Sequence, residues 1–334
     1  MTKLSIIVPV YNVENYIRPC FESIFKQGLD DNDYEIIIVN DGSTDNSMKM
    51  IEDIINQHKN ITIINQENQG LSVARNNGIA KAKGDYLLML DSDDLLFDSS
   101  IDPLLREAEN GNADIIVADF VRMIASEKGQ VPVIRQKQFS IQEKTGEQLL
   151  LEDLDPNECY VWRSLFRKLF LQNNNIRFIP GVRFQDVHFT HECYIKAKKC
   201  IRASWILNIY RVGRLGAATE SFNIQKASEF ITVIVNTWNL RHLDRLSQKV
   251  IRKIENDIFV SFSLFSYMTL YTNIDMTTKL KLLKRLKVEA PDIFFRNTPK
   301  QIFYSILFKY LPLIYWYVLY LKNSIKQYSP LKEI

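Results

Sequence analysis

Residues 84–97 read GDYLLMLDSDDLLF, a short apolar run followed at once by a cluster of carboxylates. Tyr86–Leu90 has the unbroken apolar pattern of a strand that is buried on both faces. Asp91, Asp93 and Asp94 follow within four positions, where their charges repel one another unless a cation lies between them. Hard oxygen ligands favour Mg²⁺ or Mn²⁺ over zinc. We therefore expect a divalent-metal site at this strand end; the alternative is an acidic turn that only starts a helix.

The segments before this stretch alternate between strand and helix patterns. The expected strands are Leu4–Val8, Tyr34–Val39, Ile61–Ile64 and Tyr86–Leu90, separated by expected helices at Val13–Lys26, Ser47–Gln57 and Leu71–Ala82. This spacing predicts βαβ crossovers and a mostly parallel sheet. The strand-to-helix loops of such a sheet share one edge, so we expect residues 9–12, 40–45 and 91–94 to converge there.

The rest of the chain has a less regular pattern and then a helical one. Asp114–Ala118 is an expected strand, and Val161–Asn173 is an expected helix. The later expected helices are Ala227–Leu243, Lys249–Tyr271 and Thr277–Val288. The region 216–223 is the expected domain boundary.

The polar loops lack the common phosphate-binding sequences. No GxGxxG follows the first strand and no GxxxxGK[ST] occurs, which argues against a dinucleotide dehydrogenase and a P-loop kinase. The loops instead offer Tyr11, whose ring can stack on a nucleobase, and Asp41, whose carboxylate can accept a hydrogen bond from a base or a ribose. The alternative for Asp41 is a turn residue in Asp-Gly-Ser. Thr44 or Asp45 is placed to cap the next helix.

Composition and charge limit the class of protein. A 334-residue chain with 46% hydrophobic and 24% charged residues is a folded globular protein. A net charge of +3 is too small to argue for a nucleic-acid partner. Four scattered cysteines without a CxxC pair fit a reducing compartment, and the first apolar run is too short for a signal peptide. We therefore expect a cytoplasmic protein.

Positive charge gathers near the C-terminus. Residues 245–334 carry 15 Lys or Arg against 6 Asp or Glu, so a membrane surface is the expected partner of residues 277–326, with solvated helix faces as the alternative. A helix over residues 302–321 would reach about 30 Å, enough for a bilayer. Lys309 and Pro312 are costly inside hydrocarbon, however. A helix in the membrane plane, a buried or dimer-interface helix, and a true span remain alternatives, and the oligomeric state stays open.

Four blocks of sequence resemble glycosyltransferase family 2 in order and spacing. They are SIIVPVYN (5–12), IIIVNDGSTDNS (36–47), NQGLSVARNNGIAKAKGDYLLMLDSDDLL (68–96) and FQDVHF (184–189). The resemblance implies the GT-A fold, an α/β, Rossmann-like mixed sheet, mostly parallel, with helices on both faces, that binds a nucleotide-sugar and usually a divalent metal. We accordingly expect a catalytic domain at residues 1–220 and a helical, membrane- or partner-associating region at 221–334.

The resemblance also assigns donor-site roles by position. It places Pro9, Tyr11 and Asp41 at the nucleobase and ribose. It places Arg75 on the nucleotide side of the pocket, where an arginine suits a diphosphate or a base; pairing with a surface acid is the alternative.

The same comparison assigns the acidic loop to the metal and the diphosphate. Asp91 and Asp93 would form the family's DxD element, with Asp93 as the more direct ligand of Mn²⁺ or Mg²⁺. Ser92 lies between them and is expected to contact the donor. Asp94 would support these residues, cap a helix near Ser99, or contact the sugar.

The segment around Asp186 resembles the acceptor side of the family. Asp186 stands where the family carries the base that deprotonates the acceptor hydroxyl, a task that suits an ionised carboxylate. The family commonly has Glu-Asp there, whereas this chain has Gln185 before Asp186, and a plain helix-start aspartate is the alternative. His188 and His191 do not match the HExxH pattern of zinc proteases, so we expect ordinary histidines. Residues 210–214 resemble the loop that closes this domain in the family, which implies that Arg211 or Arg214 contacts the diphosphate.

The leading prediction is a metal-dependent, inverting glycosyltransferase of the hexosyltransferase type. It would move a sugar from a nucleotide diphosphate donor, with UDP as the expected nucleotide, to a hydroxyl of a glycan or lipid-linked oligosaccharide. The expected process is bacterial surface-polysaccharide synthesis at the inner face of the cell membrane. The absence of QxxRW argues against a processive polymerase. The alternative is a haloacid-dehalogenase-type phosphatase with Asp91 as nucleophile, although Leu95 stands where that motif has Thr or Val. An inactive carbohydrate-binding protein is a third possibility.

Overall fold

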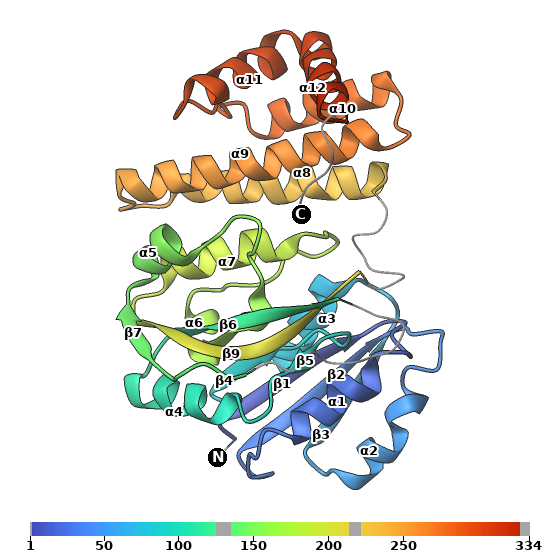
Figure 1. Ribbon diagram of the computed structural model, residues 1–334, viewed down its shortest axis with the longest axis vertical. Coiled ribbons are helices and arrows are strands. Elements are labelled where there is room, and N and C mark those ends of the chain that lie inside the picture. Colours follow the sequence, from blue (N-terminus) through green and yellow to red (C-terminus); the bar gives the residue numbers. More distant parts are fainter. Residues whose placement is uncertain (1, 125–134, 214–221, 328–334) are drawn as a thin grey trace. The chain divides into compact units, whose positions relative to one another are not determined.

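The computed structural model describes residues 2–124, 135–213 and 222–327. They form two compact units (Figure 1). The sheet unit comprises Met1–Asp153, Cys159–Gly181 and Phe189–Ala217; the helical unit comprises Leu154–Glu158, Val182–His188 and Ala218–Ile334. The expected boundary segment 216–223 lies mostly outside the described residues, and a functional division at residue 220 stays a prediction.

Nine strands of the described residues form one mixed sheet in the sheet unit. They are β1 (Leu4–Val10), β2 (Tyr34–Asp41), β3 (Ile61–Gln66), β4 (Tyr86–Met89), β5 (Leu95–Leu96), β6 (Ile115–Ile124), β7 (Ile141–Lys144), β8 (Ser164–Arg167) and β9 (Cys200–Val212). Their order is β3-β2-β1-β4-β8-β6-β9-β5, and β7 also pairs with β9. The strands β1 to β4 pair in parallel, whereas β8 runs antiparallel to both its neighbours. The expected mixed, mostly parallel sheet is confirmed.

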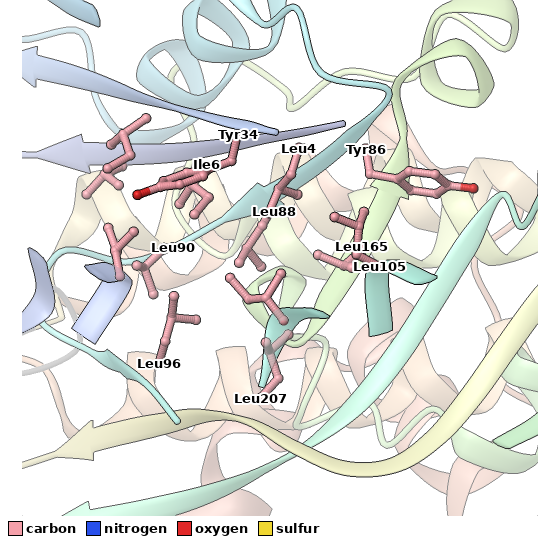
Figure 2. Packing of buried hydrophobic residues seen from close by; sticks show 14 of the residues in the cluster. Leu4, Ile6, Tyr34, Tyr86, Leu88, Leu90, Leu96, Leu105, Leu165 and Leu207 are labelled. Atoms are coloured by element: carbon pink, nitrogen blue, oxygen red, sulfur yellow. The ribbon is translucent and has the colours of Figure 1, made fainter. Parts of the chain in front are cut away.

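Helices cover both faces of this sheet (Figure 1). They are α1 (Ile17–Phe25), α2 (Glu52–Gln57), α3 (Leu71–Lys81), α4 (Ile101–Gly111), α5 (Gly146–Gln148), α6 (Lys168–Asn173) and α7 (Gln185–Lys196), of which α7 begins in the helical unit. Ile6 and Leu88 pack with residues of α1 and α4 in the main core, part of which Figure 2 shows. Ile7 points to the opposite face, where α3 packs so closely that a Cβ on Gly78 would lie 2.3 Å from Ile7 Cγ2.

Residues 161–173 differ from the expected single helix. Val161–Arg163 is a 3₁₀ turn, the next four residues are β8, and only the last six are helical. Strand β8 lies between β4 and β6, where its Leu165 and Phe166 are buried. A short apolar run fits a buried strand as well as a helix, and pairing with two strands favours the strand here.

The helical unit contains α8 (Ile224–Asn239), α9 (Gln248–Tyr271), α10 (Met276–Glu289), α11 (Pro299–Tyr310) and α12 (Pro312–Gln327). Residues 302–321 therefore belong to two helices rather than one. Pro312 lacks an N–H and disfavours helical backbone at Leu311, whose φ and ψ are −131° and 58°. None of the described helices combines the length and apolar character needed to cross a membrane.

Candidate active site

The loops after β1 and β2 are fastened to each other. The Thr44 backbone N–H donates to Asn12 Oδ1 at 2.9 Å, and the Val13 N–H donates to Ser47 Oγ at 2.8 Å. The helix α1 begins at Ile17 and not at Val13 as expected, and residues 14–16 form a turn before it. These two loops meet at the carboxyl edge of the parallel strands, as predicted.

Asp45 joins the loops and does not cap the next helix. Its Oδ2 accepts from the Glu14 N–H at 3.0 Å, and its Oδ1 accepts from the Ser47 N–H at 3.0 Å. The helix α2 starts only at Glu52, after Ile51, without a side-chain cap. The expected cap by Thr44 or Asp45 was therefore wrong.

Pro9 and Tyr11 lie at the end of β1. Pro9 is buried opposite Val39, beyond the last residue of β1 that pairs with β4. The ladder tolerates a missing N–H there, because β4 has already ended. Tyr11 is 49% exposed, so its ring is accessible to a ligand. Their contact with a nucleobase stays a prediction.

Asp41 anchors the segment that leads into α3. Its carboxylate is only 4% exposed and accepts hydrogen bonds from Gln66 Nε2 (2.8 Å), Gln69 N (2.8 Å) and Gly70 N (2.9 Å). A carboxylate has about four acceptor positions, so most of its capacity is used inside the protein. The structure thus gives Asp41 an anchoring role that the sequence did not predict, and its contact with a nucleotide stays a prediction.

Arg75 pairs with the first carboxylate of the acidic loop. Its Nη2 lies 2.6 Å from Asp91 Oδ1, and its guanidinium lies 5.2 Å from the centre of the Phe178 ring. The Arg75 side chain is 1% exposed, against 26% for Asp91. A buried arginine therefore supplies part of the positive charge that the sequence argument assigned to a metal. Arg75 therefore does pair with an acid, the partly exposed Asp91, and its place on the nucleotide side of the pocket stays a prediction.

Arg211 holds the other end of the acidic loop. Its backbone N–H donates to Asp94 Oδ1 at 2.8 Å, and its Nε donates to the Asp93 carbonyl at 2.9 Å. Burial, together with the charges of Asp93 and Asp91, raises the pKa of Asp94 well above its ordinary value. Asp94 binds the end of β9, and α4 has no side-chain cap, so the helix-cap alternative for Asp94 was wrong. Its supporting role and its contact with the sugar stay predictions. Arg214 lies outside the described residues.

The donor atoms of the acidic loop fit a metal that shares its ligands with a substrate. Asp91 and Asp93 offer the hard oxygens that Mg²⁺ and Mn²⁺ prefer. In the part of the chain that the structure describes, no three His, Cys, Asp or Glu side chains gather into a metal site of their own. Magnesium commonly binds one or two carboxylates plus substrate phosphates.

An aromatic cluster near this loop was missed by the sequence reasoning. The Tyr160 and Trp162 rings stack with centres 4.7 Å apart, and the Tyr210 ring lies 5.3 and 5.2 Å from them. Burial first, and then neighbours that include Asp94, raise the pKa of Tyr210 to about 12. Tyr210 immediately precedes Arg211 in β9, in a segment that the sequence singled out for its arginines and not for this ring.

Asp186 is the second residue of α7 and belongs to the helical unit. Phe184 precedes the helix with a φ of 61° and stacks on Phe230, with ring centres 4.3 Å apart. Gln185 is 6% exposed. A first-turn aspartate is also favourable for the helix itself, so the role of Asp186 as catalytic base stays a prediction.

Comparisons with known proteins agree with this architecture. Residues 5–172 match the family described as Glycosyl transferase family 2. The uncharacterized glycosyltransferase EpsJ of Bacillus subtilis is 35% identical over 210 residues, which are 62% of this chain and 60% of EpsJ. A poly(ribitol-phosphate) beta-glucosyltransferase of Bacillus spizizenii is 30% identical over 200 residues, 59% of this chain and 30% of that protein.

A solved structure shares the fold over the whole chain. The crystal structure of S. aureus TarS 1–349 in complex with UDP superposes with a TM-score of 0.71 at 18% identity, covering 100% of this chain and 94% of TarS 1–349. The fold is therefore that of the GT-A glycosyltransferases, and the comparisons do not favour the phosphatase alternative. The sheet, the order of the four motif blocks and the match over residues 5–172 lead to one conclusion: the chain belongs to glycosyltransferase family 2 and is a glycosyltransferase.

Proposed function

We propose that this enzyme transfers a hexose from a UDP-sugar, with a bound divalent metal and with inversion, to a hydroxyl of a glycan or lipid-linked oligosaccharide. The observation that carries the proposal is the buried Arg75–Asp91 pair beside Asp93, at the carboxyl edge of the parallel strands. Ligands of open α/β sheets bind at this edge. Arg75 balances part of the negative charge of the acidic loop at Asp91. The remaining carboxylate oxygens of this loop can then bind a metal together with a diphosphate.

The nucleoside half of the donor would lie over the loops after β1 and β2. The exposed Tyr11 ring can stack on a base, and Pro9 and Asp41 lie at the ends of the adjacent strands. UDP is the proposed nucleotide because the TarS structure of the same fold was crystallised with UDP. This similarity supports the proposal without assigning a contact.

Asp91 and Asp93 would hold the metal, which when bound would neutralise charge on the leaving diphosphate. The acceptor oxygen forms a bond to the anomeric carbon while the bond from that carbon to the diphosphate oxygen breaks. The diphosphate leaves with the bonding electrons, and the acceptor proton passes to the Asp186 carboxylate. Attack from the side opposite the leaving group inverts the anomeric carbon.

The acceptor is proposed to be a surface polysaccharide or its lipid-linked precursor, made at the inner face of the cell membrane. The support is the similarity to a relative whose name specifies glucosyl transfer to poly(ribitol-phosphate).

A thermal-shift screen of nucleotide-sugars with Mn²⁺ or EDTA tests the donor. A ligand that binds the folded protein raises its melting temperature. We expect UDP-sugars to raise it with Mn²⁺ and much less with EDTA. A shift that GDP-sugars produce and UDP-sugars do not would contradict the choice of UDP, and an equal shift in EDTA would contradict the metal.

A substitution at Asp186 tests the base separately. Asp186→Asn should leave the UDP-sugar shift unchanged while transfer to acceptor falls, because donor binding does not need this carboxylate. Asp98→Asn, an exposed aspartate in the sheet unit, is the control and should transfer at the wild-type rate. Full activity of Asp186→Asn would remove this residue from the mechanism.

A further inference from the structure

The last two helices of the helical unit carry apolar side chains on two sides. On the inner side, Phe308 and Tyr315 pack on Phe262 of α9, and Tyr315 Oη lies 2.6 Å from Ser266 Oγ. Other apolar residues of the two helices are exposed: Ile302, Phe303, Ile306, Tyr310, Leu311, Leu313, Ile314, Tyr317, Tyr320 and Leu321. We call these ten residues the outer face.

The outer face is too regular to be a scatter of single exposed residues. In α11, residues 303, 306 and 310 recur at helical spacing, and in α12 residues 313, 317 and 320 do the same. Tyr310 is 66% exposed and Tyr317 is 61% exposed. Isolated apolar residues on a surface need no explanation, whereas contiguous ones mark an interaction site.

The end of α9 extends the same surface. Tyr267 and Tyr271 are 53% and 49% exposed, and their ring centres lie 4.7 Å apart. Desolvation first, then Tyr267 and then Tyr320 of α12, raise the pKa of Tyr271, and α12 contacts α9. Tyrosine is enriched at membrane–water interfaces, where its ring meets apolar chains and its hydroxyl meets water.

The charges around this face select its partner. Residues 293–327 contain Arg296, Lys300, Lys309, Lys322 and Lys326 and no Asp or Glu. Lys322 Nζ lies 5.6 Å from the centre of the Tyr304 ring, within the range of a cation–π contact. A second copy of this chain would bring positive charge against positive charge, which argues against self-association through this face. An anionic lipid surface attracts all of them.

The lengths of the helices set the orientation. The 12 residues of α11 and the 16 residues of α12 reach about 18 Å and about 24 Å, short of the roughly 30 Å of a bilayer core. We propose that the outer face docks in the plane of an anionic membrane, with its aromatic and aliphatic residues among the lipid chains and its lysines at the headgroups. This inference identifies the membrane-contacting surface of the proposed function, but it depends on no residue of the donor site.

Vesicle sedimentation with the full chain tests the inference. The wild type should bind vesicles with about 30% phosphatidylglycerol, bind phosphatidylcholine vesicles much more weakly, and lose most of its binding in about 1 M NaCl. Ile306→Glu/Tyr317→Glu should weaken binding by about tenfold or more, because it removes apolar contact and adds negative charge. The control Val288→Glu/Ile124→Glu adds the same charge at positions that are 70% and 78% exposed outside the outer face, and should bind more tightly than the outer-face variant.

Several results would overturn the inference. If the outer-face variant binds vesicles as strongly as the control, the membrane contact does not lie on the outer face. Absence of wild-type vesicle binding, with dimers that the outer-face variant abolishes, would make the surface a self-association site. If a variant unfolds, wild-type binding to the two kinds of vesicle at low and high salt still tests the inference, and wild-type binding that depends on neither salt nor anionic lipid would contradict it. Donor binding without vesicles should be unchanged in the outer-face variant, so a failure here is distinct from a failure of the proposed donor.

Discussion

Removing Arg75 should destabilise the sheet unit and uncover the charge of Asp91. Their atoms lie 2.6 Å apart, with the arginine side chain 1% exposed and the aspartate 26% exposed. Removing one partner of a buried ion pair costs about 3–5 kcal/mol, and the partial exposure of Asp91 places the expected value near the lower limit, about 3 kcal/mol. Arg75→Leu should therefore lower the free energy of unfolding by about that amount.

A double-mutant cycle separates the ion pair from other effects of the substitution. We would measure urea unfolding for the wild type, Arg75→Leu, Asp91→Asn and the double variant. A coupling free energy of about 2 kcal/mol is expected, because each single change removes the same attraction. Mn²⁺ should also stabilise Arg75→Leu more than the wild type, since Asp91 Oδ1 then becomes available to the metal. Coupling below about 0.5 kcal/mol would refute the view that Arg75 balances the charge of this loop.

Three further substitutions probe other parts of the sheet unit. Tyr11→Ala should weaken UDP binding by about tenfold in calorimetry without changing the melting temperature, because the ring is 49% exposed and base stacking contributes about 1–3 kcal/mol; unchanged affinity would exclude a stacking role. Gly84→Ala should lower stability by about 3 kcal/mol, since the new Cβ would lie 2.5 Å from the backbone of Leu4, whereas Gly111→Ala meets only a side-chain end at 3.3 Å and should cost much less in the same denaturation assay. Burial alone would raise the pKa of Asp119, but two cationic neighbours lower it below the ordinary 3.8. The ionised Asp119 carboxylate therefore stabilises the fold above that pH, and this contribution is lost as the pH falls through the lowered pKa. The stability difference between wild type and Asp119→Asn should accordingly shrink in acid, and a difference that grows in acid would reverse the sign of this argument.

The parallel half of the fold was predictable because its strands are continuous apolar runs separated by helices. The middle was less so: residues 164–167 form a strand because they lie between β4 and β6, and this pairing partner is invisible in a local pattern. Residues 302–321 were expected as one helix, although the restriction that Pro312 places on Leu311 is a local feature, and the structure divides the stretch there into two helices.

The candidate site likewise has a part that could be predicted from the sequence and a part that could not. Residue types and spacing predicted that acidic and aromatic side chains follow the strands β1, β2 and β4. They did not predict the partners, because Arg75 and Asp91 lie 16 positions apart and Arg211 and Asp94 lie 117 positions apart. Contacts over such separations depend on the complete sheet. Asp41 was expected to face a nucleotide. Its hydrogen bonds to residues 66–70 could not be predicted for the same reason, and they became evident only in the folded chain.

Titration of UDP into the protein by calorimetry, with Mn²⁺ and then with EDTA, tests the central claim most directly. The wild type and the exposed control Asp98→Ala should bind UDP tightly with Mn²⁺ and at least about tenfold more weakly in EDTA, while Asp93→Ala should bind weakly in both. Asp93→Ala that binds UDP as tightly as the wild type, with the same response to Mn²⁺, would contradict the assignment of this loop to a metal and a diphosphate.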